Sequence, residues 1–392
     1  VSVGWIMSEE GFLGDNLAFL DYLKIRGSIS RMGNDRIDPY QFLRTFDFES
    51  GQVFGTDKNQ FTGLSQDVEP NPEITWEVAK TQNIGVDAIF WEGLLGMTLD
   101  AFYTERSNIL SRRNAAIPEF AGLELPLENI GIVDNRGFEI ELSHQNRIGE
   151  FRYSIKSNLS YAKNKVIFTD EPEGVLDWQK QEGMKMGSTL NLIVLGIYRS
   201  QSEIDNTPHW PGTRINDLQY EDIDGDGVIT NKDRVRQNKS DIPEYTFGTN
   251  IRMDYKNFDL SMLWQGATNV WQRFWVPQGV FGNVLQDMFD NRPHEGNPNS
   301  KYPNLTYDGS QVSALDSEFT MRDASYVRLK NLELGYTVNA ENFFLESMRI
   351  YVNGFNLLTF DKLKWVDPEG SDSRGRFYPQ NKIFNVGVNI NF

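Results

Sequence analysis

The sequence predicts an all-β chain whose antiparallel strands form part of a membrane-spanning β-barrel. Three observations predict this class. Short strands alternate apolar and polar residues along the chain, tight turns alternate with very long connections, and no apolar run approaches the roughly 18 residues that a membrane-spanning helix needs. No stretch has the convincing spacing of an amphipathic helix.

The last strand, residues 383–392, has the clearest pattern. One face of this extended segment carries only apolar side chains, those of Phe384, Val386, Val388, Ile390 and Phe392. The other face carries small or polar groups, from Asn385, Gly387, Asn389 and Asn391. A strand of a soluble sandwich can also alternate, but a barrel with lipid outside and water inside predicts this arrangement in strand after strand.

The same alternation recurs before this strand, and counting from Phe392 gives about 11 strands. The stub at residues 1–5 is expected to be the first. The others are expected near 23–30, 83–90, 97–104, 138–143, 151–159, 245–254, 258–264, 327–336 and 348–352. The phase slips between Leu329 and Leu332, which predicts a β-bulge there.

The connections differ sharply in length. Tight turns are expected at 91–93, 147–149 and 256–257, and long segments at 107–136, 165–243 and 267–323. Outer-membrane barrels have short periplasmic turns and long extracellular loops, so the tight turns and the C-terminus are expected on the inner side. A soluble sandwich or lectin-like barrel stays open, because charged residues on the second face could be a solvated surface.

Composition narrows the function classes. A net charge of −17 argues against a nucleic-acid partner, and the absence of cysteine excludes disulfides, thiolate metal sites and a cysteine nucleophile. No nucleophile elbow or phosphate loop is present, so an enzyme is not expected. Aromatic residues make up 13% of the chain, which suits interfacial girdles or a stacking surface for a ligand. One cluster of them, for which a girdle or loop packing is favoured over sugar stacking, comprises Trp264, Trp271, Phe274, Trp275 and Phe281.

Residues 222–233 have the spacing of a calcium-binding loop. Loop positions 1, 3 and 5 are Asp222, Asp224 and Asp226, and Gly227 at position 6 allows the sharp turn. The predicted ligand set is completed by the Val228 carbonyl, Thr230 and Asp233, the last of these in place of the usual glutamate. We expect a structural Ca²⁺ that orders the long segment 165–243; an acidic turn without an ion is the alternative.

Several stretches resemble SusC/RagA-type TonB-dependent transporters, in the order in which that family carries them. They are Val3-Gly4-Trp5 with Ser8 to Phe12, Asn71 to Glu77 with Asn83 to Asp87, Asn129-Ile130-Gly131 with Asn135 to Glu139, Ser325 to Tyr336, Asn356-Leu357-Leu358-Thr359 and Tyr378-Pro379-Gln380.

The resemblance implies a Gram-negative outer-membrane barrel of about 22 strands closed by a plug, with residues 1–392 as its C-terminal portion. The plug, the TonB-contacting segment and the signal peptide are expected outside this chain. The implied partners are a SusD-like surface lipoprotein as lid, the TonB–ExbB–ExbD complex acting through the N-terminal part, and the remaining barrel strands. The implied activity is energised uptake of oligosaccharides or peptides. A secreted, soluble, calcium-stabilised carbohydrate-binding β-sandwich is the alternative.

The sequence assigns no substrate-binding residue. Basic side chains on the polar strand faces could line a transport path or form salt bridges within the wall, and both possibilities stay open. They are Arg26, Arg152, Arg252, Arg328 and Lys330.

Overall fold

The structure, a computed structural model, describes residues 1–14, 17, 19–56, 58–66, 68–113, 125–274, 284–305, 312–339, 346–370, 377–378 and 380–392. Two residues of the predicted aromatic cluster, Trp275 and Phe281, and one residue of a motif, Pro379, lie outside the described residues.

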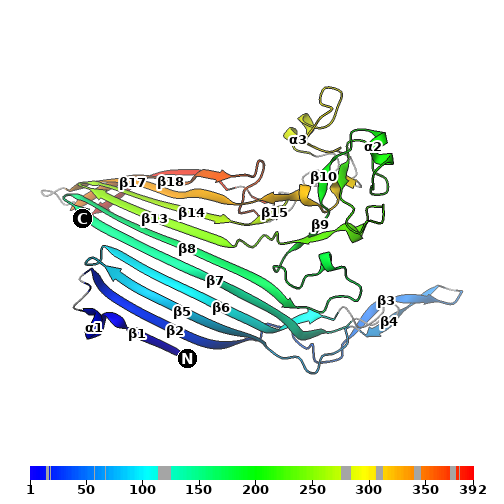
Figure 1. The fold of residues 1–392 in the computed structure, drawn as a ribbon, viewed down its shortest axis with the longest axis horizontal. Helices are drawn as coiled ribbons and strands as arrows, with labels where there is room; N and C mark the ends of the chain where they lie inside the picture. Colours follow the sequence, from blue (N-terminus) through cyan, green and yellow to red (C-terminus); the bar gives the residue numbers. More distant parts are fainter. Residues whose placement is uncertain are drawn as a thin grey trace.

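The described residues form one antiparallel sheet of 11 strands, which confirms the predicted fold class and strand number. The 11 strands are paired in the order in which they occur along the chain. Figure 1 shows them side by side as a curved wall. The strands are β1 (Ser2–Ile6), β2 (Leu20–Asn34), β5 (Glu77–Phe90), β6 (Leu95–Arg112), β7 (Leu127–Ile148), β8 (Phe151–Phe168), β13 (Tyr245–Tyr255), β14 (Phe258–Thr268), β17 (Tyr326–Asn339), β18 (Ser347–Asp361) and β19 (Ile383–Asn391).

The predicted tight turns are confirmed and gather at one end of the sheet, which we call the turn end. Three consecutive residues with positive φ, Trp91, Glu92 and Gly93, reverse the chain between β5 and β6. Gly149 and Lys256 have positive φ in the other two turns. The C-terminus lies at this same end (Figure 1).

The predicted long segment at 107–136 is wrong in its extent, because β6 continues to Arg112 and β7 begins at Leu127. Two register shifts, on either side of Ile109, interrupt the pairing of these strands, and Asn108 has φ +58°. A bulge moves side chains to the opposite face, so the alternation that marks a strand is lost there. The bulge predicted in β17 is confirmed between Leu329 and Asn331.

The opposite end of the sheet, which we call the loop end, carries shorter elements that alternation did not predict. A hairpin of β3 (Phe46–Phe54) and β4 (Asn59–Gln66) projects from it (Figure 1). Further pairs are β9 (Thr189–Asn191) with β12 (Val235–Gln237), β10 (Val194–Ile197) with β11 (Leu218–Tyr220), and β15 (Trp271–Arg273) with β16 (Met321–Asp323).

The helices are short: α1 (Gly11–Gly14), α2 (Gln201–Asp205) and α3 (Gln286–Asp290), with the 3-10 turns Met7–Glu9, Asp177–Gln179, Asn231–Asp233, Val312–Ala314 and Glu318–Thr320. Among the described residues no helix is both long and apolar enough to cross a membrane.

The two longest connections pack on each other to form a small core at the loop end. Its buried side chains are those of Leu192, Leu218, Tyr220 and Ile229 from the first connection and Val312 from the second. The Ser313 hydroxyl donates to the buried Asp217 carboxylate at 3.2 Å, which ties the two connections together. We call this unit the loop-end core.

Candidate functional site

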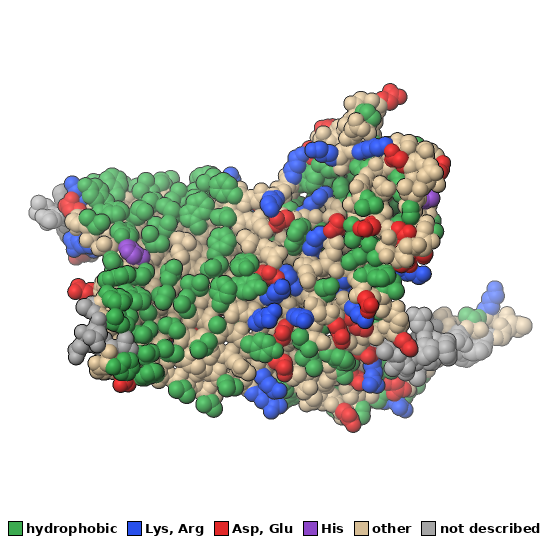
Figure 2. Space-filling view, viewed as in Figure 1, with side chains coloured by type: hydrophobic (Ala, Val, Ile, Leu, Met, Phe, Trp, Pro, Cys, Tyr) green, Lys and Arg blue, Asp and Glu red, His purple; other side chains and the backbone are tan. Residues whose placement is uncertain are grey.

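The apolar strand faces point away from the body of the molecule. Phe384, Val386 and Phe392 are 74%, 77% and 81% exposed, and Val352 and Leu334 continue the exposed row on β18 and β17. In Figure 2, hydrophobic side chains cover the part of the sheet next to the turn end, and charged side chains are concentrated nearer the loop end. An exposed apolar face of this extent requires an apolar environment.

The opposite strand faces carry a connected polar network. Asn385 of β19 donates to Asn353 of β18 at 2.9 Å, and Asn353 donates to Glu333 of β17 at 3.1 Å. Arg349 joins Glu333 at 2.7 Å and reaches Asp259 of β14 at 2.9 Å through Nε. Four neighbouring strands thus pair their polar groups along one face, as the inner wall of a water-filled barrel does.

Four of the five predicted basic residues form salt bridges, either within the wall or between the wall and a loop. Arg26 of β2 lies between Asp87 of β5 at 3.1 Å and Asp100 of β6 at 2.6 Å. Arg252 lies 3.6 Å from Asp254, and Lys330 lies 3.5 Å from Glu369. Within the described part of the chain Arg152 has no ion pair.

Arg328 on β17 fastens a loop to the inner face of the wall. This guanidinium is 1% exposed and pairs with Asp367 at 2.6 Å and with Glu369. Glu369 also accepts hydrogen bonds from the Tyr326 hydroxyl and the Gln265 amide, each at 2.7 Å. We call this group of Arg328, Asp367 and Glu369 the clasp. Sequence reasoning missed its two acids, because they lie about forty residues after Arg328 in a loop, where no alternation places them.

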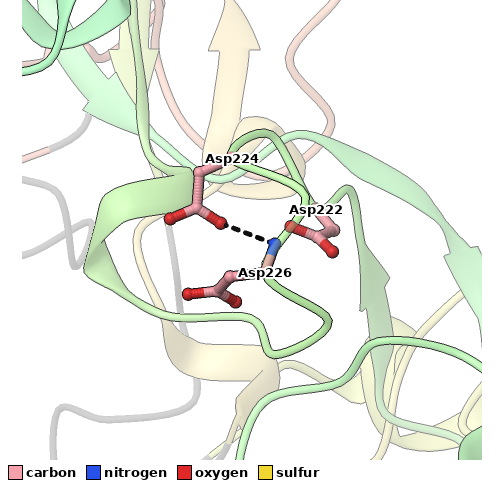
Figure 3. A group of neighbouring side chains, drawn as sticks. All are labelled: Asp222, Asp224 and Asp226. Carbon is pink, nitrogen blue, oxygen red and sulfur yellow. Dashed lines mark hydrogen bonds between the residues drawn. The ribbon is translucent and has the colours of Figure 1, made fainter.

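The predicted calcium loop brings three of its carboxylates together. Ligand atoms of Asp222, Asp224 and Asp226 lie within 4.8 Å of one another. Figure 3 shows the three side chains grouped on the loop, with the Asp226 amide donating to the Asp224 carboxylate at 3.1 Å. Asp222 accepts from the amides of Gly225 at 2.8 Å and Gly227 at 3.0 Å, and both glycines have positive φ.

The remaining predicted ligands are differently engaged. Both carboxylate oxygens of the buried Asp233 accept backbone amides, from Ile223 at 2.8 Å and Thr230 at 2.7 Å. Thr230 Oγ1 accepts from the Lys232 amide at 3.1 Å. The Lys232 ammonium lies 3.8 Å from Asp224 and 3.7 Å from Asp226, so it partly balances their charge. The donor set of clustered carboxylates suits a hard cation such as Ca²⁺. Val228 lies in the same loop, and its amide donates to the Asp226 carboxylate at 3.0 Å.

A family model described as TonB dependent receptor-like, beta-barrel, matches residues 15–357 of the chain. Two TonB-dependent receptors of Formosa agariphila, P26 and P3, are each 28% identical to it over 429 and 433 residues. Both alignments cover 100% of this chain but only 42% and 41% of the relatives, so the chain spans well under half of their length.

Solved structures have the same fold. The RagAB peptide transporter matches with a TM-score of 0.75 at 21% identity, over 100% of this chain and 43% of that one. The RagAB peptide importer in its open-open state matches with a TM-score of 0.76 at 21% identity, over 100% of this chain and 42% of that one. The alternative of a soluble sandwich is wrong, because the 11 strands form one sheet of barrel type and not two packed layers.

Proposed function

The chain belongs to the TonB-dependent receptor-like β-barrel family of the Gram-negative outer membrane, and from this premise we propose that it builds part of the wall of an energised uptake channel. The resemblance to SusC/RagA-type transporters is confirmed at the level of the family. The observation that carries the proposal is the division of the 11 strands into an exposed apolar face and a hydrogen-bonded polar face. Such a wall separates lipid from an aqueous path.

We propose that further strands of the same protein complete the barrel. Among the described residues β1 pairs only with β2, and β19 only with β18, so the sheet has two open edges. Unpaired backbone groups are too costly in lipid for such edges to stay open. Together with a plug, about 22 strands make a closed transporter of the expected kind.

The proposed cargo is an oligosaccharide or a peptide, taken up with a SusD-like lipoprotein as lid and with energy from TonB–ExbB–ExbD. One matching structure is named as the RagAB peptide transporter, which supports a peptide as one of the two cargo classes. The loop end offers the lid a broad surface of charged side chains (Figure 2).

Uptake of fluorescently labelled oligosaccharides and peptides by intact cells tests this proposal. Cells that lack the gene for this protein and cells that lack TonB should both lose uptake of the same cargo. A plasmid copy of the gene should restore this uptake only in cells that contain TonB. Purification of the protein in mild detergent should also recover a surface lipoprotein. Uptake that persists without TonB would contradict an energised channel.

We further propose that residues 222–233 hold a structural Ca²⁺. The loop is fixed on both sides: Ile229 is buried in the loop-end core, and the Trp178 indole donates to the Lys232 carbonyl at 2.8 Å. Lys232 only partly neutralises the negative charge of the clustered carboxylates. A bound cation would neutralise more of this charge and reduce the repulsion between them. It would thereby order the segment that joins β8 to β13.

Calcium titration of the purified protein tests the site. At ten times the dissociation constant, Ca²⁺ should raise the free energy of unfolding of the loop-end core by about 1.4 kcal/mol. Asp224→Asn should abolish the heat of binding. The control Asp47→Asn removes an exposed carboxylate of the β3–β4 hairpin and should leave binding unchanged. Absence of binding heat at millimolar calcium would exclude the site.

A further inference from the structure

A cavity of about 610 Å³ opens among the loops at the loop end of the sheet. Its walls come from four separate parts of the chain: Phe274 after β15, residues 291–302 after α3, Phe319 with Arg322 of β16, and residues 362–366 after β18. The last of these segments continues directly into Asp367 and Glu369 of the clasp. The cavity is therefore connected to the inner face of the wall through one short stretch of chain.

Arg322 is the most informative residue of this cavity. Its guanidinium lies over the Phe319 ring, 4.9 Å from the centroid, and its buried Nε has no hydrogen-bond partner. Within the described residues no carboxylate forms an ion pair with it. Burial lowers the pKa of Arg322, which reflects the cost of keeping this charge away from water. Charges that are partly removed from water are stabilised by a counter-charge, so this half-buried guanidinium is suited to an anion from outside the chain.

The acids nearest to the cavity are already taken by lysines. Lys362 pairs with Asp323 and Lys364 pairs with Asp287, each at 2.6 Å. Asp287 also accepts the Tyr302 hydroxyl at 2.9 Å. The chain as a whole carries a net charge of −17. An unpaired cation here therefore makes this cavity a positively charged spot on an acidic protein.

The other walls supply flat apolar surfaces and amide groups. Trp365 stacks on Phe274 with centroids 6.0 Å apart and lies 6.1 Å from the Tyr302 ring. Asn291, Asn297 and Asn299 line the same space, and the amide nitrogens of Asn291 and Asn297 already donate within the protein, which leaves their amide oxygens as acceptors. Aromatic faces match the apolar faces of sugar rings, and amides both donate to and accept from hydroxyl groups.

We propose that this cavity binds an acidic oligosaccharide, with Arg322 pairing with a carboxylate or sulfate group of the sugar. The proposal rests on the proposed uptake function, for which it names the substrate class. A planar guanidinium can meet either anion with two parallel hydrogen bonds, and the surrounding rings exclude water from the pair.

Binding to the full purified transporter tests the proposal by calorimetry. The probes are a trigalacturonate, the same trisaccharide with its carboxylates reduced to alcohols, a sulfated galactose trisaccharide, and tetraglutamate. We expect an acidic sugar to bind at least tenfold more tightly than the neutral one. The uronate and sulfate probes then distinguish which anion is preferred.

Arg322→Gln should lower the affinity for the acidic sugar at least tenfold and leave the neutral sugar unaffected, whereas Arg322→Lys should retain part of the preference. The matched control is Arg292→Gln, since Arg292 also lies over a ring, that of Phe289 at 3.8 Å, but does not line the cavity. It should bind as the wild type does.

Equal binding of the acidic and neutral sugars by the wild type would overturn the proposal, and this comparison decides the matter even where Arg322→Gln does not fold. Unchanged affinity in a folded Arg322→Gln protein, or binding of tetraglutamate alone, would overturn it as well. TonB-dependent uptake measured on the same cells keeps the two proposals apart, because uptake of neutral cargo would persist when only the acidic-sugar assignment fails.

Discussion

At the scale of single residues, the clasp shows how a buried charge is used to hold a loop against a barrel wall. Arg328 is almost fully buried, and its two acids come from a loop about forty residues further along the chain. Breaking a buried ion pair on one side leaves uncompensated charge, which costs more than the pair contributes when intact. The clasp therefore favours a closed loop strongly over an open one.

Replacing Arg328 with methionine should free the loop that carries Asp367 and Glu369. The free energy of opening this loop should fall by about 3 kcal/mol, because two carboxylates lose their partner. Hydrogen exchange of residues 365–370, read by mass spectrometry, measures this opening. Arg31→Met, at an exposed arginine of β2, is the control and should leave the exchange unchanged. Equal protection in both variants would show that the clasp contributes nothing.

The clasp should also loosen in acid. Burial opposes ionisation of Glu369, but the Tyr326 hydroxyl and the charges of Arg328 and Lys330 outweigh it and lower the pKa of Glu369 below its ordinary 4.5. A lowered pKa stabilises the folded state above pH 4.5, and this contribution is lost as the pH falls from 4.5 through the lowered value. Exchange of residues 365–370, corrected for intrinsic rates, should rise over that window.

The control for this pH effect is Glu369→Gln. Its loop should be loosened already at neutral pH and should change less on acidification, because the titrating group has been removed. If hydrogen exchange in the wild type and in Glu369→Gln depended on pH in the same way, a group other than Glu369 would be responsible for the acid response.

At the scale of elements, substitution by lysine should destabilise the apolar face of β19 more than its polar face. Val386→Lys puts a charge on the exposed apolar face and should lower the free energy of unfolding in lipid by about 2–4 kcal/mol. Asn385→Lys, one residue earlier, faces the polar side and should cost only about 1 kcal/mol, for its lost hydrogen bond to Asn353. Unfolding in lipid vesicles measures both, and equal losses would contradict a lipid-facing row.

Alternation predicted the wall because its strands have one apolar and one polar face over many residues. Alternation did not predict the structure where strands lack one apolar and one polar face. Near Asn108 a bulge reverses the phase. In the β3–β4 hairpin the apolar side chains of Phe46, Phe48 and Leu64 are exposed, so burial imposes no alternation on them. Spacing alone identified the grouping of Asp222, Asp224 and Asp226, since local ligands need no long-range contact. The clasp and the Arg322 cavity join segments that are far apart in sequence, and no local pattern marks such contacts.

At the scale of the whole molecule, the sheet has two unlike ends, and their orientation in the membrane can be tested. We expect the loop end outside the cell and the turn end in the periplasm, because barrels of this kind have short periplasmic turns. An epitope inserted between Gly55 and Thr56, at the tip of the β3–β4 hairpin, should bind antibody on intact cells. The same epitope between Lys256 and Asn257 should bind only after the outer membrane is permeabilised. The reverse result would invert the topology.

The loop-end core implies an order of assembly. In the wall each strand meets its neighbour along the sheet, so successive hairpins can zip up with modest entropic cost. The loop-end core, however, needs Leu192 from the connection before β13 and Val312 from the connection after β14. It cannot nucleate until those hairpins have brought both connections together. We therefore expect the loop end of the protein to be the last part to fold.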